Sequence, residues 1–483
     1  MSTSASRTRR QAGDGYVASG SLKQNALGVL GILFFVLSAQ APLTGVAGAA
    51  PVAIALGNGP GAPAMYVVAG VVVLLFSVGY VAMGRHVVDA GAFYAYVGKG
   101  LGGTVGAGSA GVALLAYHTI QAAVYGLFGS VMNGLTQQYL GWDVPWWLIA
   151  LVTMVIVQAL GATGVDVGAK VLAVFVLAET SLLLLFGVVV LLTGGGPEGL
   201  APGSSFSLSA ALDGAPGVAL MFAVASMFGF EATAIYGEEA REPHRTVPRA
   251  TYLAVVLVTA FFAFTTWMLV SAHGPSSSAA AAGKALESGD GASFVAGPVS
   301  DELGAWAGDA LPILLATSLF ASILAFHNSA NRYLFSLGRE GLLPHRLSAL
   351  NGRQSPWLAG AVQTVIAALL VFPFALAGKD PVLTLFSWLS GLAVLAIMLL
   401  YFLTSVSVIV YFRRIGDTRK WNTLIAPALG AAGLAGAIWL IIANFTTLIG
   451  GDTATAVWLA LAVPGALLAG IAMPRLSGAS RGR

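Results

Sequence analysis

Apolar residues occupy most of this chain in long blocks, and short polar segments separate the blocks. A membrane-spanning helix needs about 20 consecutive apolar residues. Twelve blocks reach or approach this length, so the pattern predicts an all-α integral membrane protein with twelve transmembrane helices. The blocks are residues 26–56, 63–84, 103–134, 145–161, 169–193, 215–237, 248–272, 309–338, 357–377, 382–411, 423–443 and 454–473.

Two of these blocks contain helix-breaking residues near their centres. The first carries the stretch SAQAPLTGVAGAAP, which places Pro42 between Gln40 and Gly45, and the interruption is expected at residues 42–48. The sixth carries SMFGFEATAIYG, with a break expected at residues 226–230. Backbone groups released by a break are costly in hydrocarbon unless they line a cavity. We therefore expect the two breaks to form a polar binding site near the bilayer midplane.

The two interrupted blocks occupy matching places in the order of the chain. They open two sets of five spans, residues 26–193 and 215–411, and a repeat with an odd number of spans re-enters the membrane in the opposite orientation. This predicts a five-plus-five inverted repeat, followed by a pair of spans at residues 423–473. Residues 1–25 and 474–483 are predicted to be polar tails.

The basic residues indicate how the chain is oriented. Of the 23 Lys and Arg residues, all except Lys284 and Lys379 fall in the tails or in alternate connections on one side. Cytoplasmic loops are enriched in such residues, so that side and both termini are predicted to be cytoplasmic. The charges serve as orientation signals, and no nucleic-acid partner is expected. The longest connection on the other side, residues 273–308, is rich in Ser, Ala and Gly and predicts a loop without strong structure.

Composition narrows the class of function. Only 9% of the 483 residues are charged and 57% are hydrophobic, whereas roughly a quarter of a soluble protein is charged. The chain has no cysteine, which excludes disulfides and cysteine-bound metal. We find no phosphate-binding loop, zinc-protease helix or hydrolase elbow, and no secretory signal peptide. The sequence thus predicts neither an enzyme nor an ATP-driven pump, and no cofactor or metal site, with the lipid bilayer as its surroundings.

Two acidic residues fall inside predicted spans, Glu179 in the fifth and Glu231 in the sixth. A charged carboxylate at the centre of a membrane costs about 2.5 kcal/mol or more, and burial disfavours the charged form. Both residues are therefore candidates for coupling transport to protons.

Polar residues on two other spans are further candidates. Tyr117, His118 and Gln121 lie close together around the third span and could face one cavity. Hydroxyl groups on the eighth span leave sodium coupling open, although such groups also bond to helix carbonyls. They belong to Thr317, Ser318 and Ser322.

Three segments resemble signatures of the amino acid–polyamine–organocation (APC) permeases. The stretch GFEATAIYGEEAREPHRTVPRA resembles the connection between spans six and seven of that family, NRYLFSLGREGLLP the end of span eight, and AGAFYAYVGKGLG the loop between spans two and three. With the span layout, the resemblance covers nearly the whole chain. It implies a LeuT-like fold with spans one and six unwound around the substrate. In the second of these segments, Arg332, Arg339 and Glu340 could form ion pairs at the inner surface.

The resemblance also implies roles for individual residues. In span six, Ala225, Ser226 and Phe228 fall where the family offers backbone carbonyls to a substrate ammonium, and Gly229 and Phe230 follow. In span five, Glu179 falls about where some members carry a Lys implicated in proton coupling, so the charge is reversed here.

Span one departs from the family pattern. Many members that transport amino acids have a Gly-x-Gly whose amides bind the substrate carboxylate, and this motif falls on Pro42, Leu43 and Thr44, between Ala41 and Gly45. Proline has no N–H to donate, and the other two residues cannot adopt glycine-only backbone geometry cheaply. A proline here also resembles the putrescine-importer branch of the family, whose substrates lack a carboxylate.

Together these features predict a permease of the plasma membrane that imports an amino acid or related amine, coupled to protons, by alternating access. The substrate would lie between residues 41–45, residues 225–231 and the third span. A polyamine or organic-cation importer and a substrate–product exchanger stay open. From a different class, the chain could be a nutrient sensor that does not transport.

Overall fold

The computed structural model describes residues 25–87, 93–163, 165–288, 291–449 and 452–476. The predicted N-terminal tail, except Asn25, lies outside the described residues. So do residues 477–483 of the predicted C-terminal tail and the first three residues of the segment AGAFYAYVGKGLG. Within the described residues the protein is helical, and the sole β-type pairing is an isolated parallel bridge between Leu27 and Ala240.

The long helices follow the predicted blocks closely. They are α1 (Val29–Gln40), α4 (Ala62–Gly84), α6 (Gly103–Leu140), α7 (Trp146–Gly161), α8 (Val165–Thr193), α11 (Pro216–Met227), α13 (Pro243–His273), α16 (Ala305–Arg339), α17 (Trp357–Leu376), α18 (Ser387–Arg414), α19 (Ala426–Ala443) and α21 (Thr453–Leu476). The shorter helices and helical turns are α2 (Pro42–Thr44), η1 (Gly45–Ala49), α3 (Ala50–Val52), η2 (Ala53–Asn58), η3 (Gly59–Gly61), α5 (Phe93–Leu101), α9 (Pro202–Phe206), α10 (Leu208–Leu212), α12 (Ala232–Ile235), η4 (Tyr236–Glu239), α14 (Pro275–Glu287), α15 (Ser293–Leu303), η5 (His345–Ser348), η6 (Pro381–Phe386), η7 (Trp421–Ile425) and α20 (Phe445–Leu448).

Ten helical segments of the described chain are long and apolar enough to cross a membrane, and α7 is a shorter apolar helix. The first segment, Val29–Gly84, has 56 residues, far more than the roughly 20 that one crossing requires. Its backbone turns at Gly57, which is not helical, and at Gly59, which has φ +57°. The prediction of twelve spans counts this segment as two and includes α7.

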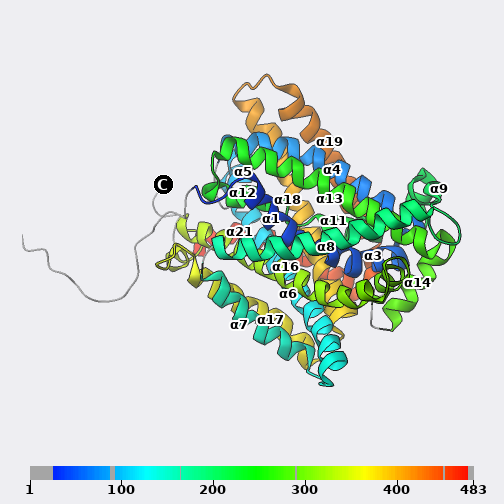
Figure 1. Ribbon diagram of the computed structural model, residues 1–483. Helices are drawn as coiled ribbons and strands as arrows, with labels where there is room; N and C mark the ends of the chain where they lie inside the picture. The colour runs from blue at the N-terminus through cyan, green and yellow to red at the C-terminus, as the bar shows by residue number, and fades with distance from the viewer. Residues whose placement is uncertain (1–24, 88–92, 164, 289–290, 450–451, 477–483) are drawn as a thin grey trace, which may run out of the picture.

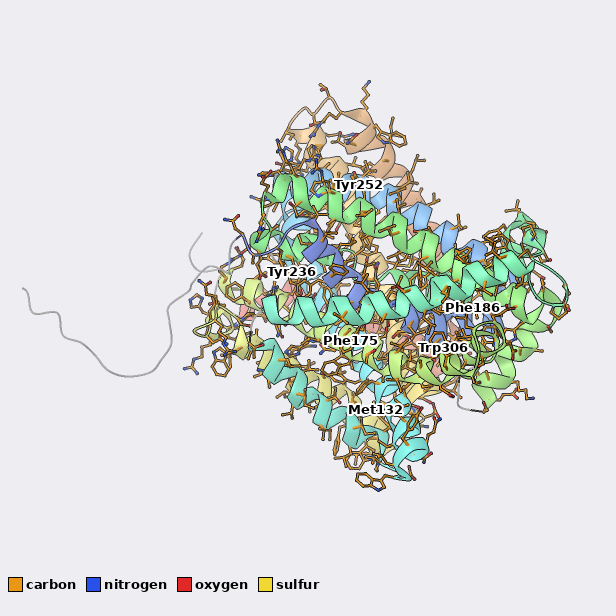
Figure 2. All side chains as sticks on the ribbon, in the orientation of Figure 1. Met132, Phe175, Phe186, Tyr236, Tyr252 and Trp306 are labelled. Carbon is orange, nitrogen blue, oxygen red and sulfur yellow. The ribbon has the colours of Figure 1, made fainter. Side chains whose placement is uncertain are left out.

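The helix α6 lies at the centre of the bundle, where it packs against α16, α18, α21 and α5. On another side α4 packs against α13, α19 and α11. Figure 1 shows α8 crossing in front of α1 and α16, and α7 lying beside α17 along one edge. Figure 2 places Tyr236 and Trp306 toward opposite ends of the molecule.

The prediction of an unstructured loop at residues 273–308 is wrong. This segment contains α14 and α15, which together bury Leu286, Phe294 and Val299 among other apolar side chains. The run SSSAAAAGKALE looks like low-complexity sequence, but alanine has the highest intrinsic helix propensity. Packing of α14 against α3 and η2 then stabilises the helix.

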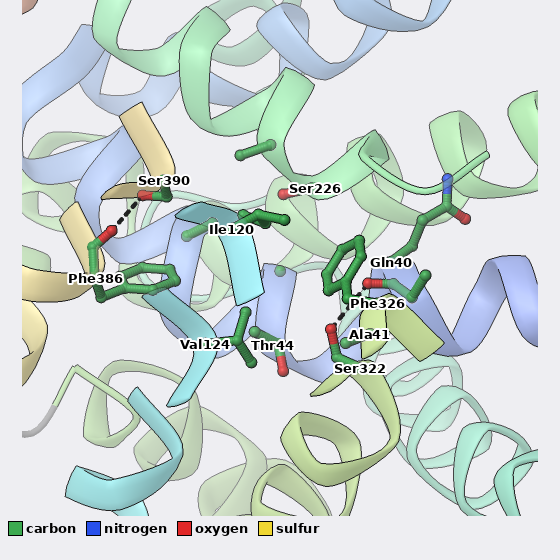
Figure 3. Close-up of a pocket in the computed structure, with 14 residues that line it drawn as sticks. Gln40, Ala41, Thr44, Ile120, Val124, Ser226, Ser322, Phe326, Phe386 and Ser390 are labelled. Atoms are coloured by element: carbon green, nitrogen blue, oxygen red, sulfur yellow. Dashed lines mark hydrogen bonds between the residues drawn. The ribbon is translucent and has the colours of Figure 1, made fainter. Parts of the chain in front are cut away.

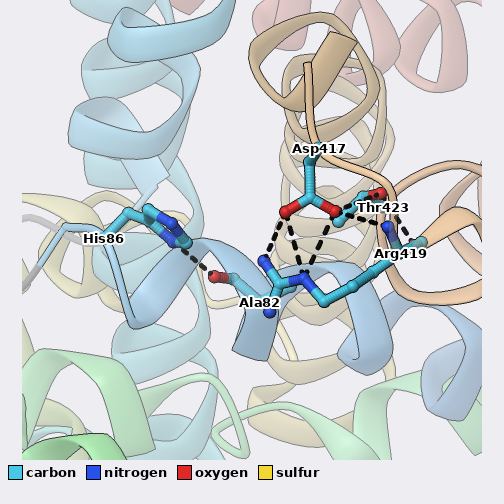
Figure 4. Close-up of polar contacts among 5 residues, drawn as sticks. All are labelled: Ala82, His86, Asp417, Arg419 and Thr423. Carbon is cyan, nitrogen blue, oxygen red and sulfur yellow. Dashed lines mark hydrogen bonds and ion pairs between the residues drawn. The ribbon is translucent and has the colours of Figure 1, made fainter. Parts of the chain in front are cut away.

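Polar contacts within the connection between α18 and α19 stabilise its conformation (Figure 4). Arg419 donates from Nη2 to Oδ2 of Asp417 at 2.7 Å, and its N–H groups hold the pKa of that carboxyl below its ordinary value. Beside it, at the end of α4, Nδ1 of His86 donates to the Ala82 carbonyl at 3.1 Å. These contacts are local and do not reach the breaks in the first and sixth blocks.

Candidate functional site

The first helix is interrupted at a single residue. Ala41 has φ +43° and ψ +79°, in the left-handed region. A residue before proline avoids the right-handed helical region, and proline is favoured at the first position of a helix. Pro42 therefore explains both the end of α1 and the restart of helical backbone in α2. The backbone stays helical through η1 and α3, so the interruption is narrower than the predicted residues 42–48.

Gly45 lies inside the restarted helix and is needed for packing. A Cβ at this position would lie 2.3 Å from the Phe262 ring and 3.2 Å from Oγ of Ser226.

The start of the new helix after Ala41 also leaves backbone N–H groups without hydrogen-bond acceptors. The Gly45 amide donates to the Ala41 carbonyl at 3.0 Å, and Pro42 has no amide hydrogen.

The amides of Leu43 and Thr44 meet no acceptor in hydrogen-bond geometry within the described part of the chain. They are the unpaired first-turn donors that every helix start exposes. Two adjacent N–H groups at a helix start form a binding position for an anionic group.

The second break separates α11 from α12, where the prediction put it. Phe228 has an extended ψ of 130°, and Gly229 has φ +113°. A Cβ on Gly229 would lie 2.7 Å from Cβ of Ala39, so the two breaks touch. The carbonyls of Ser226 and Phe228 accept no hydrogen bond from the described residues. Such carbonyls can bind a cationic group.

Two side chains link the breaks to each other and to α16. Gln40 donates from Nε2 to the Met227 carbonyl at 3.1 Å, and Ser322 donates from Oγ to the Ala39 carbonyl at 3.0 Å. The halves of the two broken helices also pack in matching pairs, α1 with α12 at one end and η1, α3 and η2 with α11 at the other.

A cavity of about 40 Å³ lies between the two breaks, α6, α16 and α18 (Figure 3). Its walls are uncharged, with four hydroxyl groups and a single amide as the polar side chains. The lining residues are Ala39, Gln40, Ala41, Thr44, Gly45, Ala49, Ile120, Val124, Ala225, Ser226, Ser322, Phe326, Phe386 and Ser390. The volume is well below the roughly 300–1,000 Å³ of typical ligand pockets, so a substrate requires the walls to move.

Five of the predicted site residues line this cavity: Ala41, Thr44, Gly45, Ala225 and Ser226. The other predicted residues at the breaks are buried but do not line the cavity: Pro42, Leu43, Phe228, Gly229 and Phe230. The Phe228 ring contacts the lining residue Phe326 edge-on, with 5.5 Å between ring centroids.

The three predicted residues of α6 do not face the cavity together. Tyr117 donates to Glu231, whereas Gln121 accepts from Gln363 of α17, and His118 is buried but does not line the cavity. The cavity wall is formed instead by Ile120 and Val124.

Sequence reasoning also missed Phe386 and Ser390, for which the sequence carries no signal. The α6 pair could have been found by spacing. Residues 117, 120 and 124 follow one helix face, so Tyr117 next to the break predicts Ile120 and Val124 beside it.

Glu231 is fully buried and well satisfied. Its carboxyl oxygens accept from the hydroxyls of Tyr117 at 3.0 Å and Tyr401 at 2.8 Å, and from the Gly229 amide at 3.0 Å. Tyr80 donates to the Glu231 backbone carbonyl at 2.8 Å. An ionised carboxylate only accepts hydrogen bonds, so three donors match its charged form and hold the broken helix to α6 and α18.

Glu179 is equally buried, but no such hydrogen-bond donors surround its carboxyl group. Neither carboxyl oxygen makes a hydrogen bond within the described residues. It lies on α8, which packs against α2 and against α16, the helix that carries Ser318. Ser318 in turn lies 3.4 Å from the hydroxyl of Thr44.

Two buried or partly buried ion pairs lie at the end of the bundle that carries most of the basic residues, which we call the basic end. Arg332 binds Glu239 with Nε–Oε1 at 2.5 Å and Nη2–Oε2 at 3.2 Å, and its guanidinium lies 4.8 Å from the centroid of the Tyr236 ring. Arg339 binds Glu238 with Nη2–Oε1 at 2.7 Å. Both arginines therefore pair with the acids of η4, in place of the expected partner Glu340.

The start of the first helix is attached to the same place. The Glu239 carbonyl accepts from the amides of Ala26 at 3.0 Å and Leu27 at 3.1 Å, and the Arg241 amide donates to the Leu27 carbonyl at 2.7 Å. These hydrogen bonds and ion pairs join the start of α1, the helix α16 and the turn η4 at the basic end of the bundle.

The sequence of the chain is similar to those of known transport proteins. A family model described as amino acid permease matches residues 27–467. The branched-chain amino acid permease BcaP of Lactococcus lactis is 26% identical over 348 residues, which cover 66% of this chain and 70% of BcaP. The histidine permease of Saccharomyces cerevisiae is 26% identical over 321 residues, which cover 62% of this chain and 49% of that permease.

Among solved structures, MhsT in complex with L-phenylalanine aligns with a TM-score of 0.57 at 18% sequence identity. The alignment covers 87% of this chain and 99% of MhsT. The chain therefore shares the fold of MhsT.

Proposed function

Since the chain belongs to the amino acid permease family of the APC superfamily, we propose that it is a secondary active transporter that imports an amino acid with an apolar side chain. It is a multi-pass membrane protein. The proposal includes twelve membrane helices in two inverted five-helix repeats, alternating access, and coupling to protons. It also places the chain in the plasma membrane with both termini and the basic end on the cytoplasmic side.

The unpaired backbone groups at the two breaks carry this proposal. Amides of Leu43 and Thr44 suit a carboxylate, and carbonyls of Ser226 and Phe228 suit an ammonium. An α-amino acid carries both charges, and half-helix ends are used in this way by transporters. None of the residues that line the cavity is charged, which favours an apolar substrate side chain. The branched-chain amino acids named for the permease BcaP and the L-phenylalanine in the MhsT complex have this chemistry.

A second candidate is an importer of polyamines or other organic cations, or an exchanger of such compounds. Pro42 favours it because the proline removes one amide from the position where a substrate carboxylate would bind. Diamines have no carboxylate and would need only the carbonyl side of the site.

Uptake by purified protein in liposomes distinguishes the two candidates. The panel contains radiolabelled L-leucine, L-phenylalanine, L-lysine, L-glutamate and putrescine, with and without an inward proton gradient, and protein-free liposomes as the control. We expect the gradient to drive uptake of one of the first two. Uptake of putrescine alone would overturn the amino acid proposal, and uptake unaffected by the gradient would overturn proton coupling.

A further inference from the structure

We propose that a pocket at the end of the molecule opposite the basic end binds a primary ammonium group, carried either by an amine or amino acid in solution or by a lipid headgroup. The pocket shares no lining residue with the cavity between the two breaks. Ammonium binding at this position is therefore a property beyond the proposed function and does not depend on it.

The pocket lies where the helical run of the first block ends. Asn58 and Pro60 form one wall, and residues of α9 and α10 together with Asp213 form the other. In Figure 1, α9 lies far from α12, which directly precedes the acids of the basic end. The pocket has a volume of about 610 Å³, within the roughly 300–1,000 Å³ of typical ligand pockets. It can therefore hold a small molecule or a headgroup without movement of its walls.

Hydrogen bonds hold the two walls together. Asn58 donates from Nδ2 to the carbonyls of Ala210 and Ala211, both at 3.2 Å. The Ala215 amide donates to the Gly57 carbonyl at 3.0 Å. Because η2 ends the first broken block and α11 follows Ala215 directly, both broken helices meet at this wall. A ligand in the pocket therefore contacts a wall that is attached to both of them.

Asn58 supplies a buried acceptor. The residue is 4% exposed, and its Oδ1 accepts no hydrogen bond from the described residues. The two carbonyls bound by Nδ2 determine the orientation of the amide group, so the oxygen is the atom left without a partner. A buried acceptor without a donor is unfavourable, and an N–H group of a ligand would remove this cost.

Asp213 gives the pocket its charge. Its Oδ1 accepts from the Gly214 amide at 2.9 Å, whereas its Oδ2 accepts nothing from the described residues. Of the described residues that line the pocket, Asp213 is the only charged one. The hydroxyls of Ser207 and Ser209 lie 3.0 Å apart in the same wall, and hydroxyl oxygens also accept hydrogen bonds. The polar side chains of the pocket thus all offer acceptor oxygens.

These groups suit a cation that donates several hydrogen bonds. Neither wall contributes a basic residue, since no Lys or Arg occurs in residues 24–84 or 171–240. A primary ammonium has three N–H donors and matches a carboxylate, an amide oxygen and hydroxyls together. Calcium, by contrast, takes about six to eight oxygen ligands at close range, whereas a single carboxylate lines this much larger pocket.

Two sources can supply an ammonium at this position. Beside the pocket, α10 exposes Leu208 at 75% and Leu212 at 61%, and exposed apolar side chains of this kind are typical of contact with a membrane surface. An ethanolamine headgroup would reach the pocket from the bilayer, and amines and amino acids would reach it from water. The recognised group is the same in both cases, so the experiment has to separate the sources.

A fluorophore that is sensitive to its surroundings, attached to Leu208→Cys, reports on the pocket. Leu208 is exposed beside the pocket without lining it, and the chain has no cysteine of its own. In phosphatidylcholine nanodiscs, ethanolamine and L-leucine should each change the fluorescence in a saturable way. Choline, whose ammonium has no N–H group, should bind with a Kd at least about tenfold higher.

Substitutions of pocket residues test the assignment of the acceptors. Asp213→Asn removes the charge but keeps an oxygen for the Gly214 amide, so the variant should fold as wild type and raise the Kd for ethanolamine about tenfold or more. Ser204→Leu, which fills the pocket without changing its charge, should weaken binding as well. The matched control is Asp309→Asn, which alters an exposed carboxylate of α16 and should bind ethanolamine as wild type does.

Replacing part of the phosphatidylcholine by phosphatidylethanolamine separates the sources. A response to the soluble amines assigns the pocket to compounds in solution, and an Asp213-dependent response to phosphatidylethanolamine alone assigns it to lipid; either result supports ammonium binding. No response to any of these compounds, equal affinity for choline, an unchanged Kd in Asp213→Asn, or a response to calcium chloride in place of the amines would overturn it. The liposome uptake panel tests the proposed function separately, so failure of one leaves the other standing.

Discussion

Glu239→Gln is the most direct test of whether ion pairs hold the basic end of the bundle closed. In the wild type, Arg332 has a side-chain exposure of 3% and Glu239 of 1%, and two hydrogen bonds join them. The variant keeps one acceptor oxygen at residue 239 but removes the negative charge, and the other contacts of the buried guanidinium are the Asn328 carbonyl at 3.0 Å and the Tyr236 ring. Removing one partner of a buried pair costs about 3–5 kcal/mol.

The neighbouring residue supplies a matched control. Glu238 pairs with Arg339, but their side-chain exposures are 17% and 30%, so the same substitution acts on a partly solvated pair. Exposed pairs contribute about 0–1 kcal/mol. We therefore expect Glu239→Gln to shift the closed-to-open equilibrium of this end by roughly 10²- to 10³-fold, at about 1.4 kcal/mol per factor of ten, and Glu238→Gln by at most about fivefold.

The chain has no cysteine, so a single reporter can be introduced without background. Ser329 of α16 is 2% exposed beneath the cavity. Labelling of Ser329→Cys by a membrane-impermeant maleimide in inside-out vesicles should be much faster with Glu239→Gln than with Glu238→Gln. Equal labelling rates in the two variants would refute the reasoning. The double variant Glu239→Leu with Arg332→Met removes both charges and should recover most of the protection, because an apolar replacement of a buried pair is often neutral.

Two further substitutions test how the breaks are held. Gly229→Ala should lower the thermal midpoint in detergent and reduce transport, because φ is +113° and the new Cβ would lie 2.7 Å from Ala39, a strain of about 1–3 kcal/mol. Gly134→Ala, where the helix leaves open space, should match or exceed wild type. Tyr401→Phe removes the 2.8 Å hydrogen bond to Glu231 and should cost about 1.5–3 kcal/mol of stability, measured by thermal denaturation. Tyr252→Phe on α13 is its control, and equal midpoints for the two tyrosine variants would contradict a supporting role for Tyr401.

The parts of the fold that local chemistry determines could be predicted from the sequence. Pro42 and Gly229 locate the two breaks because each restricts or frees the backbone at its own position. The basic residues Arg332 and Arg339 were expected in ion pairs at one end, and they form them. The same local rules failed for residues 273–308, where the alanine run was interpreted as a loop although alanine favours helix.

Side-chain direction within the bundle could not be predicted in the same way. Gln121 accepts a hydrogen bond from Gln363 because α17 packs against that face of α6, and no local pattern in either helix predicts this contact. Likewise, Glu179 and Glu231 look equivalent as lone acids in apolar spans. Their difference arises from Tyr117 and Tyr401, which reach Glu231 from distant segments.

The paired packing of the broken helices has a consequence for leakage. Each half of one broken helix packs against the matching half of the other, α1 against α12 and the run after Ala41 against α11. In the proposed alternating access, a movement that opens one end would separate its pair from the surrounding helices and leave the other pair packed in place. Because Ala41 and Gly229 interrupt the helices between these pairs, strain at one end is not transmitted rigidly to the other. Under the proposed alternating access, such a chain would open its ends in turn, so that the membrane keeps its ion gradients while solute crosses.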